Sequence, residues 1–536
     1  MSLSPQEVRQ LLETLPNQYR GPAGAVAVLQ DGEVIGQHVW GYADLERRIP
    51  LSADTPMPIC SISKQMFCTL MLDLERNPTD SMANKGPVLE QMSNMLPQIL
   101  PSEILQDTEL TIDHLCDMQS GIRDYWALCM LCGAQVDSKF SIIEDGTPML
   151  RKLKSLHFEP GTEFSYCNTN FYILGRLIEA VSKEPLANLL SERIFQPAGM
   201  KTAKLCPDTA KQPGPCIGYE GDTQGGFFRA HNAIEWSGDA GVVCSLKDMI
   251  AYERFFHSRW TDPQSGYRAA AEARSYKDGR RSSYRYGLEQ GVTRGVATVG
   301  HSGALRGYRL CRVYAPKECL SVVVMFNHES DASNAAFYTL LTLLNRPKPT
   351  IPSAEPVSEW FGSFLDQSTQ LAIRVSSYGK GKISVTYAGY PETLTLTDER
   401  NARSESMIAR IQEDSLHIHC LGDNRVLNAF RISTIDALPY DESLKGSFYC
   451  EELESTFHCE GQTGLLYGAF DGYLGRGPAN IMKHLGNDVW ALACARGVDA
   501  PAPGDWTLVF KRDENGAAIS VIIGCWLARR LEYQRM

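Results

Sequence analysis

The sequence lacks any long hydrophobic run and any excess of positive charge. No stretch approaches the roughly 18–20 uninterrupted apolar residues that a membrane-spanning helix needs. The 52 Lys and Arg residues are outnumbered by 63 Asp and Glu residues, so the formal net charge is −11. A surface with this balance does not attract phosphate backbones or anionic lipid headgroups. The sequence therefore predicts a soluble chain that binds neither nucleic acid nor membranes.

Cysteines are few and irregularly spaced. The chain has 16 of them in 536 residues, well below the density of a disulfide scaffold. The one close pair, Cys129 and Cys132, has the spacing of a metal or redox motif, but no second such pair accompanies it. We interpret it as two small buried side chains and expect no metal and no cofactor. The first residues also lack the basic start and apolar core of a secretory leader, so we expect a cytoplasmic protein with reduced thiols.

The first and last parts of the segment 1–345 carry the strand patterns. Residues 24–40 predict a β-hairpin whose turn is Asp31-Gly32, because both residue types tolerate positive φ. Two more buried strands and an Ala- and Leu-rich helix are expected near the far end, at 309–314, 320–327 and 332–345. The region between these ends is mostly helical in pattern. We therefore expect one sheet built from both ends of the segment, with a helical region inserted.

A proline-rich linker follows this segment. Residues 345–356 contain four prolines, which prevent both helix continuation and central strand pairing. Beyond it lie short alternating runs separated by turn residues, which is typical of antiparallel β-structure. The tripeptide Gly-Ser-Phe occurs at 362–364 and again at 446–448. The pattern predicts two similar antiparallel β-barrels in tandem, at 356–433 and 440–536.

One Ser-x-x-Lys motif stands at the start of an amphipathic apolar segment. On a helix, Ser61 and Lys64 share a face, so the lysine amine can reach the serine hydroxyl. A serine needs such a base to become a nucleophile, and a lysine with a lowered pKa can act as one. A second match, Ser377 with Lys380, lies in a Gly-rich turn where no helix would align the two side chains. The alternative for Ser61 is an ordinary helix N-cap.

Two further short motifs lie later in the same segment. Tyr166-Cys-Asn168 precedes a predicted helix and would aim a phenol and an amide into one cleft. His301-Ser-Gly303 lies in the approach to a predicted strand, where glycine lets a ligand come close to the backbone. Each motif has an ordinary explanation: a packed core tyrosine for the first, and chance for the second, since residues 484–486 match the same pattern.

The order of the three motifs resembles the serine β-lactamase and penicillin-binding-protein family. Tyr-x-Asn replaces the family's Ser-x-Asn, and His-x-Gly replaces Lys-Thr-Gly. Further stretches that look like family signatures include Pro160-Gly161 and 239–241, and the resemblance covers about residues 20–330. A penicillin-recognising domain followed by two small barrels is most similar to the D-aminopeptidases. The resemblance implies a multidomain α+β fold, with a β-lactamase-like α/β catalytic domain at 1–345.

The resemblance also implies a set of catalytic roles. Ser61 would accept the acyl group, Lys64 would accept its proton, and Tyr166 would protonate the leaving amine. His301 would occupy the position of the family's cationic strand residue and help to hold the proton network. The product would be an N-terminal D-amino acid, released from a peptide, amide or ester through an acyl-enzyme on Ser61.

Substrate binding is assigned in the same way. Asn168 would hydrogen-bond the substrate beside Gly303, and the backbone N–H groups of Ser61 and Ala304 would form the oxyanion hole. A free α-ammonium needs an acidic or carbonyl partner, and the catalytic domain shows no obvious one. In the related enzymes a loop of the final domain reaches the active site. Asp499, in the Pro- and Gly-rich loop 494–505, is therefore the candidate, with an ordinary solvated loop as the alternative.

Other functions remain open at this point. A D-alanyl carboxypeptidase, an esterase or a β-lactamase-like hydrolase would share the same fold. A non-catalytic binding scaffold is a further alternative, although the motif residues are all intact. The expected partner is a small peptide or amino-acid amide with a free N-terminal amine. Barrel edges and the acidic surface permit a homodimer without requiring one.

Overall fold

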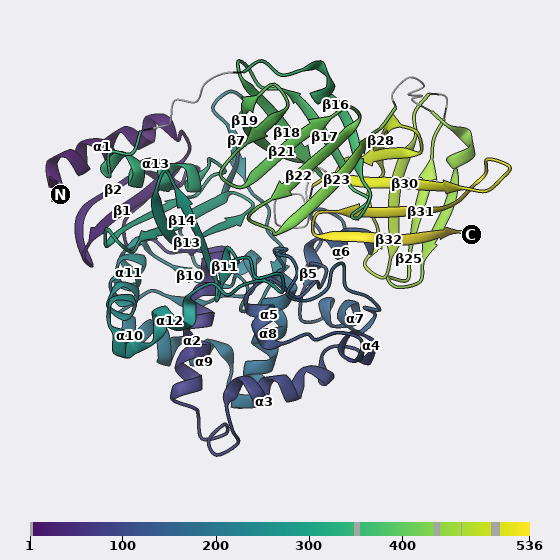
Figure 1. Ribbon diagram of the computed structural model, residues 1–536. Coiled ribbons are helices and arrows are strands. Elements are labelled where there is room, and N and C mark those ends of the chain that lie inside the picture. The colour runs from purple at the N-terminus through teal and green to yellow at the C-terminus, as the bar shows by residue number, and fades with distance from the viewer. Residues whose placement is uncertain (1–3, 348–353, 434–439, 463, 495–503) are drawn as a thin grey trace.

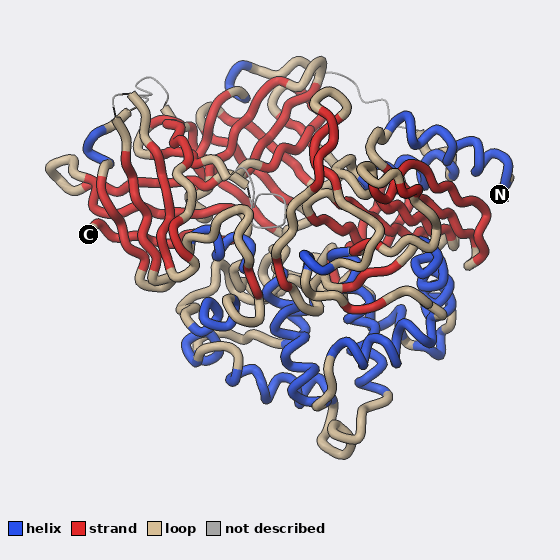
Figure 2. The backbone as a smooth tube through the Cα atoms, turned by 180° about the vertical axis from the view of Figure 1, so that it is seen from behind, coloured by secondary structure: helices blue, strands red, loops and turns tan. Residues whose placement is uncertain are grey.

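The computed structural model describes residues 4–347, 354–433, 440–462, 464–494 and 504–536. A mixed α/β body is followed by two β-barrels that lie side by side above it (Figure 1). Seen from behind, most helices gather at the base of the body, others lie beside the N-terminus, and strands fill both barrels (Figure 2). The multidomain α+β fold predicted from the sequence is confirmed.

The body is built on an eight-stranded antiparallel sheet that uses both ends of the segment. In the interior of the sheet β1 pairs with β15, with Val26 opposite Val324. Strands from opposite ends of the segment are therefore neighbours, as predicted. In spatial order the strands are β11 (Tyr284–Arg285), β12 (Leu288–Thr293), β13 (Val296–Leu305), β14 (Tyr308–Ala315), β15 (Leu320–Phe326), β1 (Ala23–Gln30), β2 (Glu33–Asp44) and β3 (Ile49–Pro50).

The hairpin of β1 and β2 turns at the predicted dipeptide. Asp31 has φ of 51° and Gly32 has φ of 78°, so both lie in the left-handed region. This geometry matches the twist of the two strands, which is why Asp-Gly is favoured in two-residue turns.

The two faces of the sheet bury different sets of side chains. Helices α1 (Pro5–Gln18) and α13 (Ala332–Leu343) cover one face, where Val8 and Leu340 share a core with Val28. The opposite face packs on α11 (Leu246–Thr261) and on the helical region, and its residues belong to the main core. Alternation along each strand therefore fills two cores at once.

The helical region carries the elements that position the candidate site. Ser61 lies in the short turn η1 (Cys60–Ile62), directly before the first long helix of the region. The helices are α2 (Ser63–Arg76), α3 (Val88–Met95), α4 (Ser102–Gln106), α5 (Ile112–Cys116), α6 (Tyr125–Leu131), α7 (Gly146–Arg151), α8 (Asn168–Ser182), α9 (Leu186–Leu190), α10 (Gln196–Ala198) and α12 (Tyr267–Ala271). Small sheets tie the region together, formed by β4 (Met57–Pro58), β10 (Val242–Cys244) and β6 (Lys204–Leu205), by β5 (Phe140–Ser141) and β9 (Ile234–Glu235), and by β7 (Tyr219–Asp222) and β8 (Gly226–Arg229).

The first barrel is a closed antiparallel ring of eight strands. Pairing of β16 with β23 closes it, and its interior is a separate core around Trp360 and Phe364, both fully buried. Closure leaves no sheet edge open for pairing with another chain. Its strands are β16 (Gly362–Asp366), β17 (Ala372–Ser377), β18 (Lys382–Tyr387), β19 (Tyr390–Asp398), β20 (Asn401–Arg403), β21 (Met407–Gln412), β22 (Ser415–Cys420) and β23 (Arg425–Arg431).

The second barrel repeats this plan. Pairing of β25 with β26 closes an eight-stranded ring, to which the short β27 is added. The repeated tripeptide opens the first strand of each barrel, and Phe364 and Phe448 are both fully buried. The strands are β24 (Gly446–Cys450), β25 (Ser455–Glu460), β26 (Tyr467–Gly472), β27 (Gly475–Arg476), β28 (Asn480–Gly486), β29 (Val489–Leu492), β30 (Trp506–Arg512), β31 (Ala518–Cys525) and β32 (Ala528–Arg535).

None of the helices within the described ranges combines the length and the apolar character that crossing a membrane requires.

Candidate active site

Ser61 lies in a single turn of 3₁₀ helix that leads directly into α2. The sequence predicted that it opens an amphipathic helix, but α2 begins at Ser63 and Ser61 belongs to the preceding turn. The residue before it, Cys60, has φ of 53°, a left-handed conformation that is costly for a non-glycine side chain. The turn presents Ser61 at the wall of a cavity of about 700 Å³.

Lys64 lies beneath Ser61 and is fully buried. Its Nζ is 3.0 Å from Ser61 Oγ, 2.8 Å from Asn168 Oδ1 and 2.7 Å from the carbonyl oxygen of Asp239. Burial lowers the pKa of Lys64 to about 8, although the nearby carboxyl groups of Asp239 and Asp124 oppose the shift. A neutral amine has two hydrogens, which the amide and carbonyl oxygens accept. Its lone pair then faces the hydroxyl of Ser61.

Asn168 is the first residue of α8 and is fixed at both ends of its amide. Its Oδ1 accepts from Lys64, while its Nδ2 donates to Asp124 Oδ2 at 3.1 Å. The backbone N–H of Asn168 donates to the same carboxylate oxygen. Burial raises the pKa of Asp124 to about 7, against the effect of these donors. Asp124 therefore orients the amide that in turn orients Lys64.

Tyr166 stands two residues before α8, as the sequence predicted. The centre of its ring is 5.1 Å from Lys64 Nζ, and its hydroxyl is buried beside Ser61. That hydroxyl forms no well-aligned hydrogen bond with any of the residues the structure describes. Burial raises the pKa of Tyr166 well above its usual value, so the phenol keeps its proton at neutral pH.

His301 is held as a neutral ring on β13. Its Nδ1 lies 2.6 Å from the carbonyl oxygen of Ser302, and its Nε2 lies 3.0 Å from the hydroxyl of Tyr284. A carbonyl oxygen only accepts, so Nδ1 carries the hydrogen and Nε2 accepts from Tyr284. Burial and the nearby Lys64 lower the pKa of His301 to about 3. The positive charge of a lysine at this strand position is therefore absent here.

Gly303 lets β13 approach the nucleophile turn. A Cβ at this residue would lie 2.4 Å from the carbonyl oxygen of Ile59 and 3.2 Å from Cβ of Cys60. The sequence argument placed a ligand in this space, whereas the structure fills it with the turn that carries Ser61. Ala304 follows on the same strand and lines the cavity with Ser61. The two N–H groups assigned to the oxyanion hole thus come from adjoining segments.

The second barrel reaches the cavity through the turn between β31 and β32. Trp526 and Leu527 of this turn line the cavity, and the carbonyl oxygen of Leu527 accepts a 3.1 Å hydrogen bond from the backbone N–H of Asp124. The predicted loop residue, Asp499, lies outside the described residues. The sequence analysis did not single out the turn at Trp526 and Leu527, and the proposed approach of loop 494–505 to the site stays a prediction.

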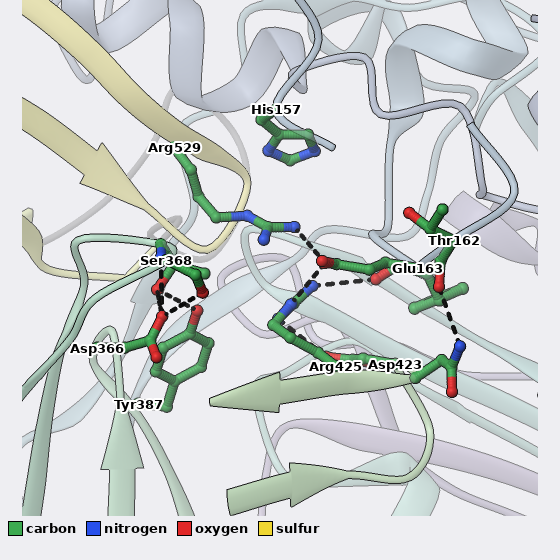
Figure 3. Close-up of polar contacts among 12 residues, drawn as sticks. His157, Thr162, Glu163, Asp366, Ser368, Tyr387, Asp423, Arg425 and Arg529 are labelled. Carbon is green, nitrogen blue, oxygen red and sulfur yellow. Dashed lines mark hydrogen bonds and ion pairs between the residues drawn. The ribbon is translucent and has the colours of Figure 1, made fainter. Parts of the chain in front are cut away.

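The first barrel holds the segment that leads to Tyr166. Glu163 accepts from Arg425 Nε at 2.9 Å and from Arg529 Nη2 at 3.0 Å, one arginine from each barrel. Figure 3 shows the glutamate between the two guanidinium groups. Phe164 adds a backbone bond, since its N–H donates to the carbonyl oxygen of Asp423 at 2.9 Å. All three structural units meet at this junction.

The structure thus brings the predicted residues together. Ser61, Asn168, Tyr166, His301 and Ala304 line one cavity, with Lys64 buried directly beneath it. The sequence analysis missed several residues that hold or line the site, because single carboxylates and aromatic residues outside motifs carry no spacing signal. They are Asp124, Glu163, Tyr284, Glu289, Asp423 and Trp526.

Comparison with known proteins gives consistent matches over the whole chain. Residues 8–344 match the family described as beta-lactamase, and residues 353–534 match D-aminopeptidase, domain B. A D-aminopeptidase of Brucella anthropi is 40% identical over 522 residues, which cover 97% of each chain. A D-aminopeptidase of Brucella canis is 40% identical over 98% of each chain.

Solved structures share the fold at low identity. The octameric penicillin-binding protein homologue from Pyrococcus abyssi has a TM-score of 0.53 at 20% identity, covering 79% of this chain and 99% of its own. The D-amino acid amidase from Ochrobactrum anthropi SV3, complexed with D-phenylalanine, has a TM-score of 0.50 at 17% identity, covering 63% of this chain and 98% of its own. By its full-length identity to these relatives, the chain belongs to the D-aminopeptidase family, with a β-lactamase-type domain at its N-terminal end.

Proposed function

We propose that this chain is a serine hydrolase that releases the N-terminal D-amino acid from small peptides, amides or esters. The observation that carries the proposal is the 3.0 Å contact between Lys64 Nζ and Ser61 Oγ, with the other amine contacts made to Asn168 and Asp239. Stereospecificity and the substrate class rest on the D-aminopeptidase relatives named above.

The acylation step begins at Ser61. Its Oγ attacks the substrate carbonyl carbon while Lys64 takes the hydroxyl proton. The carbonyl oxygen becomes an oxyanion that accepts hydrogen bonds from the N–H groups of Ser61 and Ala304. When the carbon–nitrogen bond breaks, Tyr166 donates its proton to the departing amine and recovers one from the Lys64 ammonium.

Deacylation follows the same path with water. Water attacks the ester on Ser61 as Lys64 accepts its proton, and the serine oxygen recovers a proton as the D-amino acid leaves. His301 acts as a positioning residue, because its neutral ring packs with its centre 6.0 Å from that of Tyr166. The aromatic wall of Trp126, Phe164 and Trp236 suits an apolar D-side chain.

We assign recognition of the free α-ammonium to Asp499, and a hydrogen bond to the substrate to Asn168, which lines the cavity. Asp499 belongs by sequence to the second barrel, and another turn of this barrel, at Trp526 and Leu527, lines the cavity, which supports the assignment. We further propose that the domains span 1–345, 356–433 and 440–536.

A reducing, cytoplasmic location fits the 16 cysteines, all of which are free thiols. Homodimer formation stays a prediction, to be measured by light scattering on the purified chain.

The test compares D-alanine p-nitroanilide with its L-enantiomer and its N-acetylated form. We expect turnover of the free-amine D-substrate alone, and loss of that turnover by about a thousandfold or more in Ser61→Ala. Ser377→Ala is the matched control, because this serine stands in the other Ser-x-x-Lys sequence and lies exposed at the end of β17. Equal cleavage of the N-acetyl substrate would replace the aminopeptidase with an esterase or carboxypeptidase of the same fold.

A further inference from the structure

A free carboxylate faces the cavity at the start of β12. Glu289 lies opposite Tyr284 of β11 and opposite Gly300 of β13, and it lines the same cavity as Ser61. Its side chain is exposed to the cavity. Within the described ranges, no hydrogen bond or ion pair engages it. The sequence motifs gave it no role, and the mechanism above does not use it.

Glu289 of β12 lies beside the part of β13 that leads to the active-site residues. Gly300, its partner in the sheet, directly precedes His301, and the His301 ring packs against Tyr166. Tyr166 is the group assigned to protonate the departing amine. The oxyanion hole at Ala304 lies further along the strand. Glu289 and Tyr166 line the same cavity, and, after burial, the negative charge of Glu289 contributes to the raised pKa of Tyr166, so the carboxylate lies near the group that protonates the leaving amine.

No free cation balances this carboxylate among the cavity-lining residues that the structure describes. Arg312 is the one cationic side chain there, and it is fully buried against Glu253, with its Nη2 2.9 Å from Oε2. His301 is neutral at pH 7. The other lining carboxylate, Asp423, is paired with Arg425 at 3.2 Å. A leaving group with a carboxylate would thus meet Glu289 without compensation.

We propose that Glu289 forms a cation-binding subsite for the leaving group. The preferred substrates are D-aminoacyl amides whose amine carries a second positive charge, such as those of diamines. Peptides that present a free carboxylate at this place are rejected by charge repulsion. This inference rests on the proposed D-aminopeptidase activity and deepens it, because the catalytic serine and the α-ammonium site are unchanged.

The electrostatic surroundings of Glu289 support this assignment. Its carboxylate lines the cavity and has no cation or hydrogen-bond donor beside it among the described residues, so a bound cation displaces no existing partner. A bound ammonium favours the ionised form of the carboxyl group. Its binding free energy is therefore more favourable than at a carboxylate that is already paired.

The experiment uses three D-alanyl amides of nearly equal size. The D-alanyl amide of ethylenediamine has a cationic leaving group, the n-propylamide is its neutral analogue, and D-alanylglycine ends in a carboxylate. For the wild-type chain we expect kcat/KM to be about tenfold lower for the neutral amide than for the cationic one. We expect kcat/KM for D-alanylglycine to be lower than that for the neutral amide by at least about another tenfold. Glu289→Gln should lower the cationic-to-neutral ratio by about tenfold and raise relative cleavage of D-alanylglycine.

Two further variants make the result decisive. Glu289→Asp retains the charge and should keep most of the cationic preference. Glu13→Gln makes the same charge change on the exposed face of α1, away from the cavity, and should leave all three rates unchanged. An unchanged ratio in Glu289→Gln, with the neutral amide still cleaved, overturns the subsite and leaves the aminopeptidase proposal standing. Failure of the wild-type chain to cleave any of the three amides overturns both.

Discussion

Asp124 and Leu527 are joined by a 3.1 Å hydrogen bond from the backbone N–H of the first to the carbonyl of the second. This bond ties the last barrel to the carboxylate that holds Asn168 and, through Asn168, Lys64. The barrels therefore do more than extend the chain, because their turns form part of the wall of the active-site cavity. We expect catalysis to depend on the docking of all three units.

Glu163→Gln tests this dependence at the junction in Figure 3. The change removes the charge that pairs with Arg425 and Arg529, both nearly fully buried, so that Arg529 loses its acidic partner and Arg425 keeps only Asp423. We expect about 3 kcal/mol of destabilisation by analogy with broken buried ion pairs. We also expect kcat for a simple D-amide to fall more than kcat for an activated p-nitrophenyl ester, because only the amide needs the proton of Tyr166.

The matched control for this variant is Glu159→Gln in the same loop. Glu159 is exposed and pairs with Lys277 at the surface, where ion pairs contribute about 0–1 kcal/mol. It should leave both substrates and the melting temperature nearly unchanged. Equal losses on amide and ester in Glu163→Gln would indicate general destabilisation rather than misplacement of Tyr166.

The backbone framework and the reacting groups could be predicted from sequence, for separate physical reasons. The turn at Asp31-Gly32 could be predicted because few residue types tolerate positive φ. The pairing of Ser61 with Lys64 could be predicted from their spacing of three residues. Asp124 and Glu163 could not be predicted, because their partners lie far along the chain or in the barrels. Contacts that form only when the barrels pack against the catalytic domain produce no periodic pattern in the amino-acid sequence.

The pH dependence of Ser61 reactivity should report Lys64. Because burial lowers the pKa of Lys64 to about 8, its amine is mostly protonated at pH 6 and mostly neutral above pH 9. The neutral amine is the form that accepts the serine proton, so reactivity should rise with pH through about 8 and then level off. A neutral organophosphonate that modifies Ser61 gives this profile without titration of a substrate amine. A profile that rises instead near the usual pKa of histidine would point to His301 as the base.

Tyr284→Phe should change the state of His301 with little effect on the fold. The substitution removes the donor to Nε2, leaving a neutral ring nitrogen without its 3.0 Å partner. The pKa of His301 should rise, because that hydrogen bond favours the neutral ring, and kcat should fall by about tenfold at most. The ring ¹⁵N shifts of His301, followed against pH, measure the first effect. A shift pattern identical to that of the wild-type chain would exclude the Tyr284 contact in solution.

Gly303→Ala should push β13 away from the turn that carries Ser61. The new methyl group would lie 2.4 Å from the carbonyl oxygen of Ile59, so either the strand or the turn must move. Overpacking of this kind costs about 1–3 kcal/mol, measurable as a lower melting temperature. A displacement of Ser61 by about 1 Å costs roughly a hundredfold in kcat. Gly225→Ala, in the turn between β7 and β8, is the control, since its Cβ would meet one side-chain oxygen of Asp222 at an ordinary 3.6 Å. If Gly303→Ala retains full activity, the close approach of the strand to the turn is not what positions Ser61.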